Sequence, residues 1–210
     1  MNPAARVVRL FVDIKRREVE PALLFFFFWF LVIVAFQVLK PLKKGYFVEA
    51  LGADIELYAK LANIGVAVLA VIAFTALYNA LGSRKLIATL VAVFVAALLG
   101  FAAVLGERAP SASVNWTFYL FGDLWSTIWV TTFWAYLNEM TQSEQSKRLY
   151  GLIGGGGVVG GLVGGLVVWQ LVEPLGPSTL LAGCAILTMI IGLLVWRSEM
   201  LARSPEAPIG

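Results

Sequence analysis

Six apolar stretches, each close to the length of a membrane-spanning helix, follow one another along the chain: Pro21–Leu39 or beyond, Leu57–Leu81, Leu86–Leu105, Trp116–Leu137, Leu152–Leu175 and Thr179–Trp196. A bilayer's hydrocarbon core of about 30 Å requires about 20 helical residues, and backbone amides left exposed to lipid cost several kcal/mol each. Turn and charge signals such as GSRK and EPLGPS separate the stretches. The sequence therefore predicts an all-α polytopic membrane protein with six transmembrane helices over residues 21–197.

The composition excludes several classes of function. Hydrophobic residues make up 60% of the chain and charged residues only 14%, against roughly 25% charged in soluble domains. There is no histidine, and Cys184 is the single cysteine, which argues against zinc sites, disulfides and Cys/His catalysis. With no nucleophile–base pair or metal cluster to assemble, we expect no enzyme, cofactor or metal. No aromatic-interleaved basic surface suggests nucleic acid.

The placement of lysine and arginine predicts the orientation. If the N-terminus is inside, eleven of the 16 basic residues lie on inner segments: Arg6, Arg9, Lys15, Arg16, Arg17, Arg84, Lys85, Lys147, Arg148, Arg197 and Arg203. We therefore expect a multi-pass protein of the bacterial inner membrane with both termini cytoplasmic. Residues 1–20 are interpreted as a cytoplasmic basic lead-in, either a helix on the membrane surface or a solvated segment, without a signal peptide.

The fifth apolar stretch, with Gly151 just before it, holds nine of the chain's 20 glycines. It lacks the Gly-Lys-Ser/Thr of a phosphate-binding loop and the preceding strand of a dinucleotide site. Two sets instead repeat every four residues: Gly156, Gly160 and Gly164, and Gly157, Gly161 and Gly165. Such repeats predict a flat helix face against which another helix packs closely.

Asp123 is the most costly residue to place in this membrane protein. It lies within WTFYLFGDLWSTIWVTTFW, and a carboxylate at the middle of a membrane helix costs about 2.5–3.5 kcal/mol. Seven residues beyond Trp116, it should lie about 10 Å below the outer surface. It should face a partner or a water-filled cavity, either as a functional group or as a structural carboxylate that joins two helices.

Three lysines follow the first apolar stretch, in LKPLKKG. If the helix ends at Leu39, the lysines extend to the outer headgroups. If it continues from Ala22 to Leu51, a length of about 45 Å, it should kink at Pro41. The lysines would then share one face at a depth similar to that of Asp123. The candidate substrate-binding residues are therefore Lys40, Lys43, Lys44 and Asp123, as a cationic face opposite a carboxylate.

Two segments resemble the ATP/ADP translocases of the bacterial and plastid type, whose fold is similar to that of major facilitator transporters. The first is LKPLKKGYFVEALGADIELYAKLANIGVAVLA. The second is NWTFYLFGDLWSTIWVTTFWAYLNEMTQSEQSKRLYGLIGGGGVVGGLVGG, with its acidic residue before Leu-Trp, its Phe-Trp, its Lys-Arg and its glycine-rich continuation. Between them, LGSRKLI is similar to the turn between the second and third helices of facilitators.

The resemblance implies exchange of ATP for ADP, or transport of a related phosphorylated anion, by alternating access. Lys43 matches the lysine of the family's Lys-Asp pair, and Asp123 matches a glutamate of the fourth helix. The chain departs from the pattern at Lys44, where the family has Asp. It also departs at Asp123, whose side chain is one methylene shorter than the family's glutamate. The alternative hypothesis is a non-transporting membrane subunit or scaffold that packs against a partner protein.

Six helices correspond to one half of a facilitator-type transporter, whose site lies between two halves that move against each other. The Pro/Ala-rich residues 198–210 are interpreted as a cytoplasmic tail or an inter-half linker. The expected partners are therefore a nucleotide or phosphorylated anion, the lipid bilayer and a second six-helix half. That half could lie in the same chain of a longer protein, in a homodimer or in a separate subunit.

Overall fold

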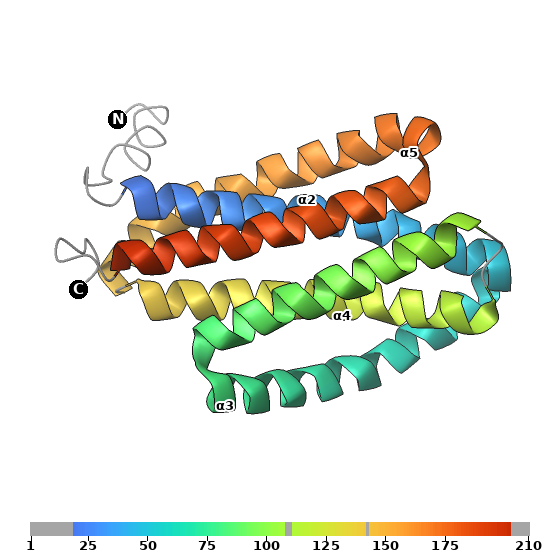
Figure 1. Ribbon diagram of the computed structural model, residues 1–210, viewed down its shortest axis with the longest axis horizontal. Coiled ribbons are helices and arrows are strands. Elements are labelled where there is room, and N and C mark those ends of the chain that lie inside the picture. Colours follow the sequence, from blue (N-terminus) through green and yellow to red (C-terminus); the bar gives the residue numbers. More distant parts are fainter. Residues whose placement is uncertain (1–18, 108–110, 142, 203–210) are drawn as a thin grey trace, which may run out of the picture.

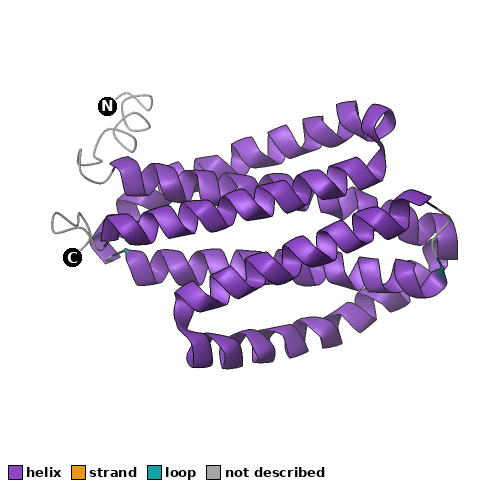
Figure 2. Ribbon diagram, in the orientation of Figure 1, coloured by secondary structure: helices purple, strands orange, loops and turns teal. Residues whose placement is uncertain are grey.

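The computed structural model describes residues 19–107, 111–141 and 143–202. They form four long helices: α2 (Val19–Leu51), α3 (Ala53–Glu107), α4 (Ala112–Met140) and α5 (Ser143–Ala202). The described part of the chain contains helices and short connections and no strand (Figure 2). The predicted all-α class is confirmed. Of the lead-in 1–20, only Val19 and Glu20 are described, and they begin α2.

Glycines with positive φ mark the breaks between apolar stretches. Gly82 (φ 71°) lies inside α3 and Gly176 (φ 74°) lies inside α5, and neither has a helical backbone conformation. Glycine adopts this left-handed region without the steric cost of a Cβ atom. Each of these helices therefore consists of two arms that fold back on each other (Figure 1). Gly52 (φ 89°) separates α2 from α3 in the same way.

Three helices are long and apolar enough to cross a membrane, over Val19–Leu51, Ala53–Leu105 and Leu149–Leu201. The fourth helix, α4, has 29 residues, and a larger proportion of its side chains is polar than in the other three helices. Because α3 and α5 each bend at a glycine, the structure is compatible with more crossings than helices. The count of six crossings and the side on which the termini lie stay predictions.

The first helix does not end at Leu39. It runs through Pro41 as α2 to Leu51, so the longer helix expected from Ala22 to Leu51 is confirmed, and the interpretation with a helix end at Leu39 is wrong. Proline is tolerated inside membrane helices because neighbouring groups satisfy the backbone that it leaves unbonded. The lysines of this segment are therefore carried on a helix and not on a loop. The kink at Pro41 stays a prediction.

The glycine-rich arm of α5 packs closely against α2. A Cβ atom on Gly160 would lie 2.6 Å from the carbonyl oxygen of Phe30, and one on Gly164 would lie 2.9 Å from that of Val34. Gly156 approaches Phe26 in the same way, so the predicted close packing is confirmed for this set of three. The other set takes part unevenly: a Cβ atom on Gly157 would collide with the Trp29 indole of α2, whereas one on Gly165 would meet nothing within 4 Å.

Candidate functional site

A cavity of about 340 Å³ opens between α2, the first arm of α3 and α4. We call it the lysine cavity; its lining residues are Phe36, Lys40, Lys43, Lys44, Glu56, Lys60, Asn63, Tyr119 and Asp123. All four predicted site residues line it, so the structure brings together the lysines of one helix and the carboxylate of another. The helical spacing of residues three and four apart places the lysines on one side of α2.

Lys43 and Asp123 form an ion pair inside the bundle, with side chains 8% and 25% exposed. The aliphatic part of Lys43 lies flat on Gly122, where an added Cβ atom would be 2.7 Å from the lysine Cδ. The ammonium group lies 4.4 Å from the centre of the Tyr119 ring, a favourable cation–π geometry. The expectation that Asp123 faces a partner is confirmed, and the partner is Lys43.

A second carboxylate, Glu56 of α3, pairs with two lysines. Its oxygens lie 3.3 Å from the Nζ atom of Lys44 on α2 and 3.3 Å from that of Lys60 on its own helix. The Glu56 side chain is 11% exposed, whereas each lysine side chain is 59% exposed. The carboxylate therefore lies below two ammonium groups that reach the solvent, and it connects the two helices.

Sequence reasoning did not identify Glu56, Lys60, Asn63 and Tyr119 as lining residues. The available signal was the spacing of Glu56 and Lys60, four residues apart, which is typical of an ion pair on one helix face. Such pairs are common on solvated helices, so the spacing alone did not point to the cavity. Only the packing of α3 against α2 and α4 shows that the face of α3 with Glu56 and Lys60 lines the cavity.

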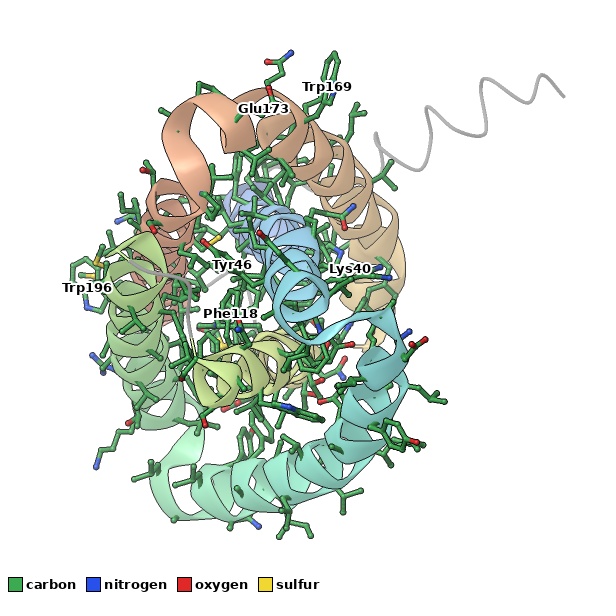
Figure 3. All side chains as sticks on the ribbon, turned by 90° about the vertical axis from the view of Figure 1, so that its right-hand side faces the viewer. Lys40, Tyr46, Phe118, Trp169, Glu173 and Trp196 are labelled. Atoms are coloured by element: carbon green, nitrogen blue, oxygen red, sulfur yellow. The ribbon has the colours of Figure 1, made fainter. Side chains whose placement is uncertain are left out.

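Lys40 lies at the edge of the cavity. Its ammonium group is 5.6 Å from the centre of the Phe36 ring. Within the described ranges, no carboxylate lies within ion-pair distance of it. Figure 3 shows it projecting from α2 on the side away from Tyr46, whose hydroxyl donates a hydrogen bond to the Leu105 carbonyl (3.2 Å).

The cavity has an excess of positive charge. Four lysines and two carboxylates line it, which leaves two more positive than negative charges. Ammonium groups form strong charge-assisted hydrogen bonds to phosphate and carboxylate oxygens, and the two internal carboxylates occupy the same donors. The arrangement can therefore bind an anion by exchanging a carboxylate for it. No group of three metal-ligating side chains is found within residues 19–107, 111–141 and 143–202.

Comparison with known proteins identifies the family. The chain matches the TLC ATP/ADP transporter family over residues 2–114 and 111–195. The chain belongs to this family. TLC ATP/ADP transporters are membrane transporters and not enzymes, so the chain is a multi-pass integral membrane protein of a transport family. The family resemblance inferred from the sequence is confirmed.

The chain is also similar to individual carriers. It is 25% identical over 184 residues to ADP,ATP carrier protein 1 of Rickettsia bellii (strain RML369-C), which covers 73% of this chain and 36% of that carrier. It is 33% identical over 87 residues to ADP,ATP carrier protein 1 of Chlamydia muridarum (strain MoPn / Nigg), which covers 39% of this chain and 15% of that carrier.

The protein of the same name from Chlamydia trachomatis serovar D is 30% identical over 87 residues, with the same coverage of 39% and 15%. The chain thus spans 15% to 36% of the length of the curated relatives that it matches. No solved structure matches the chain significantly.

Proposed function

We propose that the chain forms one half of a transporter that exchanges nucleotides of the ATP/ADP type, or related phosphorylated anions, by alternating access. The observation that carries the proposal is the lysine cavity, in which four lysines face two carboxylates inside a membrane protein of a nucleotide-transporter family. In this proposal the phosphate oxygens bind Lys43 together with Lys40 and Lys44. Asp123 is the internal anion that they displace.

The Lys43–Asp123 pair explains how the empty site tolerates its charges. A lone charge buried in a membrane is more expensive than a paired one, because the partner offsets part of the cost of leaving water. When no substrate is bound, Asp123 pairs with Lys43. When a phosphate binds, it takes the place of the carboxylate on Lys43, and Asp123 turns toward the water of the open cavity. Lys43 is then paired in both states, and neither state holds an isolated buried cation.

The departure from the family pattern at Lys44 has a local counterpart. Where the family has an acidic residue after the lysine, this chain has a second lysine. The carboxylate of Glu56 lies 3.3 Å from the Lys44 ammonium group. We infer that Glu56 supplies, from α3, the negative charge that the departure removes from α2. Asp123 retains the carboxylate with a shorter reach, and it contacts Lys43 all the same.

In the proposed topology, both arms of α3 and both arms of α5 cross the membrane, which gives six crossings and cytoplasmic termini. The cavity walls come from α2, α3 and α4. In facilitator-type transporters, a second half supplies the opposite wall. We propose that a second six-helix half does so here, as part of a longer chain, as a second copy or as a separate subunit.

The test is nucleotide binding by the purified chain in detergent, measured with labelled ATP. We expect saturable binding that Lys43→Ala abolishes and that Lys85→Ala leaves unchanged, because Lys85 is an exposed lysine at the start of α3's second arm, beside the bend at Gly82, and does not line the cavity. Both variants are checked for a monodisperse elution profile.

Undiminished ATP binding by a well-folded Lys43→Ala protein would contradict the site assignment. The alternative hypothesis, a non-transporting subunit or scaffold, makes a different prediction. It would be favoured by a stable complex with an unrelated membrane protein together with no thermal stabilisation of the chain by ATP or ADP.

A further inference from the structure

The lysine cavity contains two separate carboxylate–lysine sets at different depths. In the inner set, a buried lysine, Lys43, faces Asp123. In the outer set, the nearly buried Glu56 lies below the exposed Lys44 and Lys60. We propose that the outer set is a second anion subsite, and that Glu56 determines whether a ligand with one phosphate or with two linked phosphates binds better. This inference rests on the proposed function, because it assigns a further specificity-determining role at the same site.

The exposure of the outer set indicates how an anion reaches it. Both lysine side chains are 59% exposed and the Glu56 side chain is 11% exposed. An anion entering from the solvent therefore meets the ammonium groups before it meets the carboxylate. One carboxylate shared by two lysines leaves one positive charge of this set without an anion. A phosphate group that bridges Lys44 and Lys60 would restore the balance.

The two sets are adjacent because Lys43 and Lys44 are consecutive residues of α2. One lysine points inward to Asp123 and the other reaches across to α3. In our proposal, a single phosphate binds at one of the two sets. Two linked phosphates can occupy both, and the second group then binds at the high effective concentration that the covalent link creates. We therefore expect linked phosphates to bind better than a single one.

A purely structural role for the outer set predicts a different behaviour. If Glu56 only ties α2 to α3, then removing its charge should loosen the cavity and weaken binding of every anion. If Glu56 competes with the ligand for Lys44 and Lys60, removing its charge should strengthen the binding of linked phosphates. The sign of the change caused by Glu56→Gln distinguishes the two roles. Glutamine keeps the size of the side chain, so packing is conserved.

The experiment measures the affinity of the detergent-purified chain for inorganic phosphate and for pyrophosphate by titration calorimetry. We expect Lys60→Gln to weaken pyrophosphate binding about tenfold, the loss of one charge-assisted hydrogen bond, and to change phosphate binding less than about twofold. We expect Glu56→Gln to strengthen pyrophosphate binding about threefold or more. Lys60→Arg should restore the affinity, and Lys85→Gln is the matched control for loss of a lysine outside the cavity.

Two results would overturn the second subsite. One is an equal or absent effect of Lys60→Gln on the two probes, and the other is weaker pyrophosphate binding by Glu56→Gln. If binding is lost in Lys43→Ala but insensitive to Lys60→Gln, the proposed function stands and the second subsite fails. If the unmodified chain binds ATP but neither probe, the second subsite fails and the proposed function stands. If it binds neither ATP nor either probe, both proposals fail.

Discussion

The end of the bundle where α2 begins and α5 ends can be compared with the region around the lysine cavity, about 30 Å along α2 (Figure 1). At that end, which we call the tied end, polar contacts join different helices: Tyr78 and Ser83 donate to Glu139 (3.0 and 3.1 Å), Arg84 pairs with Glu199 (3.0 Å), Arg197 pairs with Glu20 (2.9 Å), and Tyr136 is bonded to Ser198 (2.7 Å). Each of these polar groups has a partner on another helix or helix arm.

The lysine cavity differs in its charge balance. Three of its four lysines share two carboxylates, and Lys40 pairs with neither of them, so an anion can be added without leaving any carboxylate or lysine as an isolated buried charge. At the tied end, each of the two arginines has its own carboxylate, Glu199 for Arg84 and Glu20 for Arg197. Polar groups in this bundle therefore serve two purposes. A closed set of partners holds helices together, and a set with spare cations leaves room for exchange.

The largest expected effect comes from removing the buried cation of the cavity. In Lys43→Met, Asp123 keeps its charge but loses its partner. Removing one partner of a buried ion pair strongly destabilises the folded protein, because the other charge is left buried and uncompensated. Because the Asp123 side chain is 25% exposed, we expect the lower part of the usual range, about 3 kcal/mol. The measurement is the free energy of unfolding in detergent, followed by tryptophan fluorescence.

The control for this prediction is the double variant Lys43→Met/Asp123→Asn, which removes both charges. It should recover most of the lost stability, because no uncompensated charge remains. A single variant as stable as the parent would show that the pair is solvated and that the cavity does not bury it. In either variant, binding of ATP should be lost.

The second prediction compares two glycines of the same α5 arm. An added Cβ atom would lie 2.7 Å from the Phe26 carbonyl oxygen at Gly156, and 2.7 Å from the Cβ atom of Gln37 at Gly164. Alanine at either position should destabilise the chain by about 1–3 kcal/mol, as overpacked interiors do. Because Gln37 lies one turn before the lysines of α2, only Gly164→Ala should also weaken ATP binding.

Gly165→Ala is the matched control for both, since an added Cβ atom there meets nothing within 4 Å. Unfolding free energies and ATP affinities of the three variants are measured side by side. Equal loss of ATP affinity in Gly156→Ala and Gly164→Ala would show that packing near the tied end is transmitted along α2 to the cavity, and the two regions would then not be separable.

Much of the architecture could be predicted from the sequence. The apolar stretches and the breaks at GSRK and EPLGPS correspond to helix arms separated at Gly82 and Gly176, because the lipid-length rule and glycine's conformational freedom are local properties. The pairing of Asp123 was also predictable in kind, because a carboxylate in a membrane span needs a partner. Four of the residues that line the cavity were identified in this way.

The rest depended on packing that no local pattern reveals. Glu56 and Lys60 have the spacing of an ordinary surface pair, and only the position of α3 beside α2 makes them part of the cavity. Likewise, two glycine sets with the same period were equivalent in the sequence. The rotation of α5 turns Gly160 toward α2, whereas Gly165 makes no close approach. Helix rotation is set by the sum of many contacts, so it cannot be inferred from one repeat.

The third prediction concerns the hydroxyl group of Tyr136 at the tied end. In Tyr136→Phe the buried bond to Ser198 (2.7 Å) and the longer bond to the Val195 carbonyl (3.5 Å) are lost, while Ser198 keeps its own bond to that carbonyl (2.8 Å). We expect a loss of about 1 kcal/mol in the free energy of unfolding, with ATP affinity unchanged. The matched variant is Tyr46→Phe, whose hydroxyl bond to Leu105 is longer (3.2 Å) and only partly buried; its effect should be smaller. A larger loss in the free energy of unfolding for Tyr46→Phe than for Tyr136→Phe would contradict the view that the polar contacts of the tied end hold the helices together more strongly.

The smallest expected effect concerns the outermost contact of the tied end, between Arg197 and Glu20. Both side chains are 54% exposed, and ion pairs in contact with solvent contribute between about 0 and 1 kcal/mol, because water screens the charges and two long side chains lose freedom. Arg197→Gln should therefore change the free energy of unfolding by less than about 0.5 kcal/mol, and the small difference should vanish at high salt. A clear, salt-resistant loss of stability would show that this pair is shielded from water in the membrane. The tied end would then depend on its ion pairs as strongly as the cavity depends on Lys43.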